Sequence, residues 1–201
     1  MSGKLSDYLY YEEPGITLYC GDCRELLPNV YAETIITDPV WPNFHTKLIG
    51  SDDPRRLFGE AMKALPQDVA RICVWLGCQS DPRFLEVLPP GFPFLRMSYL
   101  RRAVPHYNGR CLVSGDVLYS FGLWPDSREG ARVVPGECSV TSIPSLREDH
   151  PAARNEQHAR WVVKWWGQDP VCDPFVGTGT TLVACKAQGV TAIGIEIEPK
   201  Y

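Results

Sequence analysis

The chain has 201 residues and a formal net charge of −4, with 44% hydrophobic and 22% charged residues. This length fits one domain that is large enough to bury a sizeable core. No apolar run approaches the length of a membrane span, and residues 1–7 lack the hydrophobic region of a signal peptide. We therefore expect a soluble intracellular protein. The negative charge argues against a protein that coats nucleic acid by bulk attraction.

Eight cysteines raise the question of disulfides or a metal site. Several of them lie in apolar runs typical of strands, namely Cys73, Cys78, Cys172 and Cys185. This placement favours buried free thiols in a reducing compartment. Cys20 and Cys23 have the spacing of half a zinc site, but no second matching pair appears, so we expect no metal.

Short apolar runs that alternate with helical patterns predict an α/β fold. Seven strands are expected: Ile16–Tyr19, Thr34–Thr37, Arg71–Leu76, Phe94–Leu100, Val117–Phe121, Val171–Asp173 and Thr191–Glu196. Helices are expected from Pro54, capped by Asp52 or Asp53, from Pro82, over Arg154–Trp166, and over Thr181–Gln188. Residues 125–145 are rich in Pro, Gly and Ser and predict a long loop.

The segment from residue 173 to residue 183 is the most informative part of the chain. A short apolar strand ends in Asp173, and Gly177 and Gly179 then let the backbone turn tightly and approach a ligand. A helix follows, and the next strand again ends in an acid, Glu196. This order predicts the nucleotide-binding half of a doubly wound fold, in which the second acid bonds ribose hydroxyls.

The details of this turn point to a particular kind of nucleotide. A third glycine three residues after Gly179 is missing, and so is the lysine of a phosphate-binding loop. Asp173 would repel a pyrophosphate but can bond the ammonium of an amino acid. Both features favour S-adenosylmethionine, an adenosine that carries a methionine. From this segment alone, an ordinary strand–turn–helix without a ligand stays open as the alternative.

Residues 34–43 form a second buried strand that ends in an acid and a rigid turn, Asp38-Pro39-Val40-Trp41. With this segment the chain resembles the amino-group DNA methyltransferases. Their catalytic motif is Asp-Pro-Pro followed by an aromatic residue, and their cofactor motif is Asp-Pro-Phe-x-Gly-Ser/Thr-Gly-Thr-Thr. The catalytic motif stands first here, an order similar to the circularly permuted β class, which includes many small phage and restriction–modification methylases.

The resemblance implies a fold and a cofactor site. The fold would be a Rossmann-like sheet of seven mostly parallel strands, with one antiparallel strand and helices on both faces. Asp22 would reach the adenine of the cofactor and Glu196 its ribose. The remaining cofactor residues implied are Asp173, Pro174, Phe175, Gly177, Thr178, Gly179, Thr180 and Thr181 of the first motif, with His150 and Arg154 of the segment that begins His-Pro-Thr-x-Lys-Pro in relatives.

The catalytic turn suits a difficult methyl acceptor. The lone pair of an exocyclic amine is delocalised into the base, and the Asp38 carboxylate and the Pro39 carbonyl can accept its two hydrogens as positive charge develops. Trp41 offers a stacking face for a base that has left the duplex. Val40 replaces the second proline of the family motif and makes the turn less rigid. We expect an active enzyme, with a degenerate methylase that only binds as the alternative.

A cluster of charged and aromatic residues is the candidate nucleic-acid surface. Tyr99 and Tyr107 are interleaved with the cationic candidates Arg96, Arg101, Arg102, His106 and Arg110. Such a pattern suits phosphate contact and base readout, whereas a solvated hairpin edge is the alternative. By resemblance, residues 44–51 correspond to a mobile loop over the site and residues 124–145 to a target-recognition loop.

These observations lead to one functional hypothesis. We expect a single methyltransferase domain over residues 1–201, with a catalytic half (16–122), a recognition loop (124–145) and a cofactor half (147–201). It would transfer a methyl group from S-adenosylmethionine to N6 of adenine in double-stranded DNA, in the cytoplasm of a bacterial or phage-infected cell. Adenine is favoured because cytosine enzymes more often carry Ser or Thr where Asp38 stands.

Several alternatives stay open. The same motif occurs in enzymes that methylate cytosine N4, RNA or protein glutamine. A non-catalytic DNA-binding protein that keeps the fold is a further alternative, whereas the missing third glycine disfavours a nicotinamide-dependent oxidoreductase. Small relatives are often dimeric, so a homodimer is open as well. Relatives usually continue into another helix after the position of Tyr201, so the chain is either unusually short or truncated.

Overall fold

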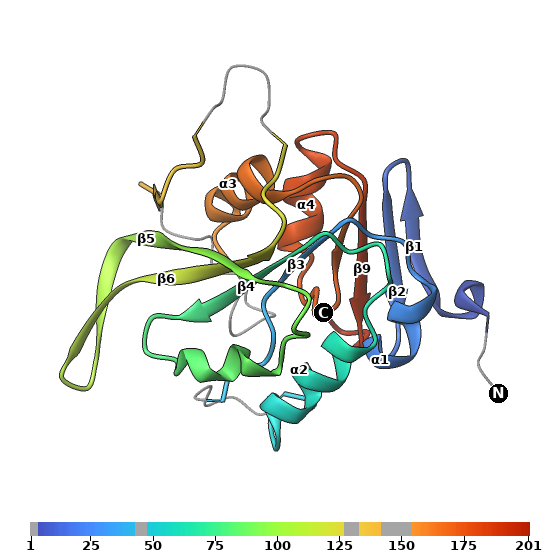
Figure 1. Ribbon diagram of the computed structural model, residues 1–201, viewed down its shortest axis with the longest axis horizontal. Coiled ribbons are helices and arrows are strands. Elements are labelled where there is room, and N and C mark those ends of the chain that lie inside the picture. Colours follow the sequence, from blue (N-terminus) through green and yellow to red (C-terminus); the bar gives the residue numbers. More distant parts are fainter. Residues whose placement is uncertain (1–3, 43–47, 127–132, 142–153) are drawn as a thin grey trace.

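The computed structural model describes residues 4–42, 48–126, 133–141 and 154–201. A nine-stranded sheet forms the middle layer, in the order β1-β2-β9-β8-β3-β4-β6-β5-β7, and helices lie on both of its faces (Figure 1). The strands are β1 Leu9–Glu13, β2 Ile16–Cys20, β3 Thr34–Thr37, β4 Arg71–Gly77, β5 Phe94–Asn108, β6 Cys111–Gly122, β7 Glu137–Ser139, β8 Val171–Asp173 and β9 Ala192–Glu196. The α-helices are α1 Cys23–Leu26, α2 Pro54–Lys63, α3 Glu156–Trp166 and α4 Thr180–Lys186, and the 3₁₀ helices are η1 Leu5–Tyr8, η2 Leu27–Asn29 and η3 Pro82–Val87.

The predicted α/β fold class is confirmed, and each of the seven expected strands is present. The expected count of seven was too low, because β1 and β7 add two strands at the edges of the sheet. Two strands of the described sheet, β1 and β6, run against the other seven, whereas one antiparallel strand was expected. The side chains of β1 are almost all exposed, so this strand lacks the apolar alternation by which a strand is recognised in a sequence.

The helix starts follow their capping residues. Asp53 caps α2 by accepting a hydrogen bond from the Arg56 amide at 3.0 Å, with Pro54 in the first turn as expected. The segment from Pro82 is a 3₁₀ helix rather than an α-helix. In α3 the cap is Asn155, so the helix begins two residues later than predicted. None of the described helices is long and apolar enough to cross a bilayer.

The core has two parts, one on each face of the sheet. Ile36 and Trp75 belong to the cluster under α3 and α4, and Ile35 and Val74 belong to the cluster under α1, α2 and η3. Neighbouring residues divide in this way because successive side chains of a strand point to opposite faces. The central strands β3, β4 and β8 are therefore buried on both faces, which explains why apolar residues follow one another directly within them.

All eight cysteines are free, and five of them are buried. Cys73, Cys172 and Cys185 lie in the core as expected, and the pKa of the Cys73 thiol is raised to about 12 because burial disfavours its thiolate. The placement of Cys78 in a strand was wrong. It follows the last residue of β4, where the chain turns, and its side chain is exposed.

The connections of the sheet place a crevice between β8 and β3. From β3 the chain moves outward to β4, and from β8 it moves outward in the other direction to β9. Because β2, β9, β8, β3 and β4 are parallel, their carboxyl ends meet at one edge. Open α/β sheets bind ligands at such a topological switch point, just outside the carboxyl ends of the strands.

Candidate functional site

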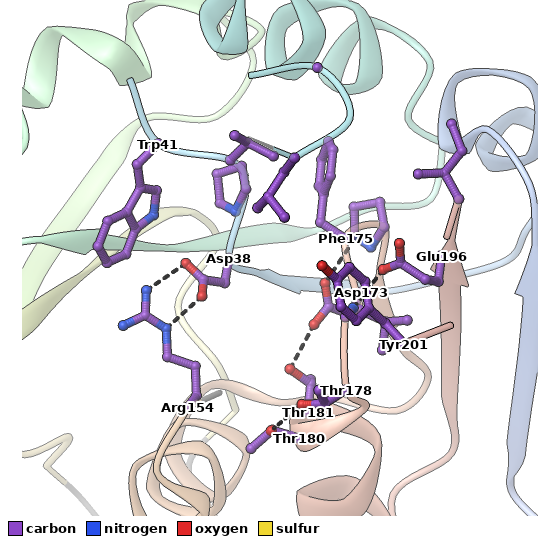
Figure 2. Close-up of a pocket in the computed structure, with 18 of the residues that line it drawn as sticks. Asp38, Trp41, Arg154, Asp173, Phe175, Thr178, Thr180, Thr181, Glu196 and Tyr201 are labelled. Carbon is purple, nitrogen blue, oxygen red and sulfur yellow. Dashed lines mark hydrogen bonds and ion pairs between the residues drawn. The ribbon is translucent and has the colours of Figure 1, made fainter. Parts of the chain in front are cut away.

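A cavity of about 750 Å³ opens at this edge of the sheet. The predicted site residues that line it are Asp22, Asp38, Pro39, Val40, Trp41, Arg102, Arg154, Asp173, Pro174, Phe175, Gly177, Thr178, Thr180, Thr181 and Glu196. The lining therefore brings together candidates from four strand ends and from the start of α3 (Figure 2). Gly179 caps α4 beside the cavity without lining it. His150 lies outside the described residues.

Asp173 is the most deeply buried acid of the site, with 2% of its surface exposed. Its Oδ1 accepts hydrogen bonds from the Thr37 hydroxyl at 3.0 Å and the Phe175 amide at 3.1 Å. Its Oδ2 accepts one from the Thr181 hydroxyl at 2.7 Å. Burial nevertheless raises the pKa of Asp173 to about 7, against an ordinary value of 3.8. The carboxyl group thus ties β3, β8 and α4 together and stays sensitive to any cation placed beside it.

The turn after Asp173 depends on backbone conformations that favour glycine. Gly177 has a φ of +50° and Gly179 has a φ of +78°. A side chain at either position would be strained, because L-residues rarely adopt positive φ. The turn directs the Gly177 amide toward Glu196, whose Oε2 accepts its hydrogen at 2.8 Å, and Oε1 accepts from the Glu198 amide at 2.9 Å. Glu196 is thereby fixed at the mouth of the cavity, with the lone pairs that these amides do not use left for a ligand.

Asp22 is fixed by a neighbour that the sequence did not single out. Its carboxylate caps α1 through the Arg24 amide at 2.9 Å and forms an ion pair with the Arg24 guanidinium at 2.5 Å. The hydrogen bonds from Arg24 hold the pKa of Asp22 below its ordinary value. Arg24 also binds Glu60 on α2 at 2.6 Å and lines the cavity. Its position two residues after an N-cap acid is the signal that could have identified it.

The catalytic turn holds the other end of the cavity. Arg154 donates to both oxygens of the Asp38 carboxylate, from Nε at 2.5 Å and from Nη2 at 2.7 Å. The same guanidinium lies 4.4 Å from the centre of the Trp41 ring (Figure 2). Burial raises the pKa of Asp38, while the Arg154 charge opposes that rise. Arg154 was predicted beside the cofactor, and in the structure its guanidinium binds the carboxylate of Asp38, the predicted catalytic residue.

Asp116 of β6 is a site residue that the sequence reading missed. Its Oδ2 accepts from Arg154 Nη1 at 2.8 Å and from Arg102 Nη2 at 2.9 Å, and it is 5% exposed. Two acids and two arginines thus alternate from Asp38 through Arg154 and Asp116 to Arg102. The signal was an acid next to the apolar residues Val117 and Leu118 in a strand, since buried acids need charged partners.

The predicted nucleic-acid residues divide into two groups along the β5–β6 hairpin. Three of them already bind groups of this chain: Arg96 donates to the Val134 carbonyl, Arg101 pairs with Glu137, and Arg102 pairs with Asp116. His106 and Arg110 lie at the exposed tip, and their side chains make no hydrogen bond or ion pair with other described residues. Of the predicted nucleic-acid surface, the tip with His106 and Arg110 is therefore the part whose side chains are available to a partner.

Two predicted loops fall partly outside the described residues. Residues 44–47 of the loop after the predicted catalytic turn and residues 127–132 and 142–145 of the recognition loop are not described. Leu48, Ile49 and Gly50, at the described end of the first loop, line the cavity. Across the described ranges, no group of three or more His, Cys, Asp or Glu is placed to hold a metal ion.

Comparisons with known proteins agree with this architecture. Residues 119–201 match the sequence profile of a family described as DNA methylase. A stretch of 31 residues is 55% identical to part of the type II methyltransferase M.MjaII of Methanocaldococcus jannaschii. This stretch makes up 15% of this chain and 6% of that protein. The chain thus spans only a small part of this curated relative.

Solved structures are similar over nearly the whole chain. The M1.HpyAVI–SAM complex superposes with a TM-score of 0.66 at 20% identity, over 92% of this chain and 95% of that one. The cytosine-N4-specific PvuII DNA methyltransferase gives 0.66 at 16% identity, over 92% and 83%. A putative DNA modification methylase from Thermus thermophilus, complexed with S-adenosyl-L-methionine, gives 0.60 at 21% identity, over 92% and 88%.

The fold is therefore the fold of the S-adenosylmethionine-dependent methyltransferases. Residues 119–201 carry the signature of the amino-group DNA methylases, whose N6-adenine and N4-cytosine enzymes share one family profile. The resemblance that the motifs predicted is confirmed at this level. Assignment to the circularly permuted β class stays a prediction that rests on the order of the two motifs.

Proposed function

We propose that the protein is an S-adenosylmethionine-dependent DNA methyltransferase that methylates an exocyclic amine, N6 of adenine in particular. One observation carries the proposal: β3 and β8 are adjacent, and they deliver Asp38-Pro39 and Asp173 to one cavity. The acceptor pair for an amine thus stands beside the glycine turn of a nucleotide site. The DNA methylase profile supports the family, and the choice of adenine rests on the acid at position 38.

The cavity suits the proposed cofactor. Its volume of about 750 Å³ lies within the range of small-molecule sites. Glu196 would accept from the ribose hydroxyls, Asp22 would face the adenine, and Asp173 would balance the methionine ammonium. These three acids would repel a pyrophosphate, whereas they match a nucleoside that carries an ammonium group. When bound, S-adenosylmethionine supplies an electrophilic methyl group on a sulfonium.

The residues of the catalytic turn prepare the acceptor. The carboxylate of Asp38 and the carbonyl of Pro39 accept the two amine hydrogens, which favours the charge that develops as the nitrogen becomes tetrahedral. Trp41 presents its ring to the base. Because the target amine lies inside the duplex, the base must leave the stack first. Asp38 then provides the nearest carboxylate for the proton that the methylated nitrogen releases.

Methyl transfer to unmethylated duplex DNA tests the proposal directly. Labelled S-adenosylmethionine is incubated with the protein and DNA, and the digested nucleosides are separated and identified by mass. N6-methyladenine is the expected product. N4-methylcytosine would retain the reaction and replace the base, whereas methylated RNA or protein in place of DNA would reject DNA as substrate. Retained cofactor binding without transfer to any of these acceptors would favour the non-catalytic alternative.

Replacing Glu196 by alanine is expected to weaken S-adenosylmethionine binding by about 10- to 100-fold, because hydrogen bonds to a charged group contribute about 1.5–3 kcal/mol. Isothermal titration calorimetry measures the change. Glu198→Ala is the matched control, since Glu198 also lines the cavity but pairs with Lys200. Equal affinities of the Glu196 variant and the unaltered protein would remove Glu196 from the cofactor site.

The DNA partner is proposed to meet the tip of the β5–β6 hairpin, which projects from the sheet in Figure 1. Tyr107 is 79% exposed there, beside His106 and Arg110. Arg110→Ala is expected to weaken DNA binding and to lower the slope of log K against log salt by about 1, as the loss of one phosphate contact would. Fluorescence anisotropy over a salt series gives the slope. Lys63→Ala on α2 controls for net charge, and an equal change in both variants would contradict a contact at the tip.

A further inference from the structure

The catalytic turn has a weakness that its sequence makes visible. Asp38 and Trp41 flank Pro39 and Val40, and Val40 stands where the family motif has a second proline. Proline fixes φ, so this turn has one more free backbone dihedral than a double-proline turn. An acceptor pair works only if the carboxylate and the carbonyl keep their geometry. Something outside the turn must therefore limit its freedom.

Arg154 contacts the turn on both sides of this weak point. Its Nε and Nη2 donate to the two oxygens of Asp38, and its guanidinium carbon lies over the Trp41 ring, 4.4 Å from the ring centre. The Trp41 ring is also close to Gly77 at the end of β4, where an added Cβ would lie 2.8 Å from the ring carbon Cζ3. The indole thus has Arg154 and the end of β4 as neighbours. A single side chain restrains the first and the last residue of the turn.

Asp116 binds the part of the Arg154 guanidinium that does not contact Asp38. Nη1, the guanidinium nitrogen that does not bind Asp38, donates to Asp116 Oδ2 at 2.8 Å. The side chain of Arg154 is 14% exposed and that of Asp116 is 7% exposed, so water screens this pair weakly. Arg102 supplies the second cation for Asp116 at 2.9 Å. The four charges compensate one another, which lets Arg154 and Asp116 be mostly buried.

We propose that Arg154 is a positioning residue that clamps the Asp38–Trp41 turn in place of the missing second proline, and that Asp116 fixes the clamp. The inference rests on the proposed function for its kinetic consequences. Arginine suits the task because its planar fork has five N–H donors and can serve two carboxylates and a ring at once. A lysine keeps the charge but offers a single ammonium on a flexible stem.

A double-mutant cycle between Arg154 and Val40 tests the clamp. Arg154→Lys is expected to lower kcat at least tenfold, with the Kd for S-adenosylmethionine within threefold of the unaltered protein. In a Val40→Pro background the same Arg154→Lys change is expected to lower kcat less than threefold, because the second proline restores the rigidity. Among the described residues the Val40 amide donates no hydrogen bond, so the proline removes none. Equal losses in the two backgrounds would overturn the compensation.

A titration that needs no activity tests the contact itself. The Asp38 carboxyl carbon is followed by NMR from pH 2 to pH 8 in the unaltered protein, in Arg154→Gln and in Arg83→Lys. Loss of the Arg154 charge is expected to raise the Asp38 pKa by at least one unit, because the guanidinium stabilises the carboxylate. Arg83 also forms a forked pair with an acid, Asp81, but at the exposed surface, so its variant controls for a change of arginine elsewhere. An unchanged Asp38 pKa in Arg154→Gln would refute the clamp.

The two tests separate the inference from the proposed function. Without methyl transfer by the unaltered protein, the proposed function fails, and the titration still decides whether Arg154 holds Asp38. With transfer, kcat that rises in Arg154→Lys would overturn the clamp by showing that Arg154 obstructs the base. Asp116→Asn should also lower kcat, as Arg154→Lys does. An unchanged kcat in Asp116→Asn would show that Asp116 does not fix the position of Arg154.

Discussion

Replacing Asp38 by alanine is expected to lower kcat for methyl transfer by at least about 10²–10³-fold, as the loss of one preorganised polar group at a reacting centre does. The variant loses the side-chain half of the acceptor pair and keeps the Pro39 carbonyl. Affinity for S-adenosylmethionine should stay within a few-fold, because Asp173, Glu196 and Asp22 lie at other strand ends. Single-turnover transfer and calorimetric cofactor binding measure the two quantities separately.

The Asp38 experiment needs a control for folding and one for charge. Arg154 loses a partner in the variant but keeps Asp116 at 2.8 Å, so circular dichroism and a urea titration should accompany the kinetics. Asp68→Ala removes an exposed acid outside the cavity and should leave transfer unchanged. A cofactor affinity that falls as far as kcat would contradict the role assigned to Asp38 and would place it in the cofactor site instead.

The parts of the fold that a sequence reveals are those with a local physical cause. The bounds predicted for β3 and β8 agree with the structure, because both strands are buried on both faces and read as short continuous apolar runs. Asp38 and Asp173 follow these runs directly. Parallel strands end at one edge of the sheet, and the resemblance to the methyltransferases implied that these two acids serve one reaction.

The relations between distant residues had no such local cause. The sequence shows an arginine at position 154 but does not show which acid it pairs with. Its contact with Asp38 spans 116 positions of the chain. Asp116 was not predicted as a site residue for a related reason. The role of an acid inside a strand depends on its partners, which the sequence does not show. The edge strand β1 has exposed side chains and packs little, so its pairing with β2 is decided by backbone hydrogen bonds.

Replacing Asp173 by asparagine is expected to change how stability depends on pH. The pKa of Asp173 is about 7 in the folded protein and would be near its ordinary value of 3.8 in the unfolded chain. Between these values the unfolded chain releases the proton and the folded protein keeps it, so folding stability falls as pH rises. Each pKa unit corresponds to about 1.4 kcal/mol, which gives a loss of up to about 4 kcal/mol between pH 4 and pH 7.

The asparagine variant lacks this titration and can keep the hydrogen bonds of the site. Its Oδ1 can accept from the Thr37 hydroxyl and the Phe175 amide, and its amide group can donate to Thr181 Oγ1. The difference in free energy of unfolding between the variant and the unaltered protein should therefore grow in favour of the variant from pH 4 to pH 7 and then level off. Urea titrations at half-unit pH intervals measure it, and parallel profiles of the two proteins would contradict a raised pKa at Asp173.

The same titration links stability to the proposed cofactor. An ammonium placed beside Asp173 favours its carboxylate, so S-adenosylmethionine should lower the pKa of Asp173 and release a proton on binding near pH 7. Calorimetry in buffers of different ionisation enthalpy counts that proton. S-adenosylmethionine should release it from the unaltered protein and not from Asp173→Asn. Equal proton release by both proteins would place the methionine ammonium away from Asp173, while leaving the glycine turn and Glu196 as the nucleoside end of the site.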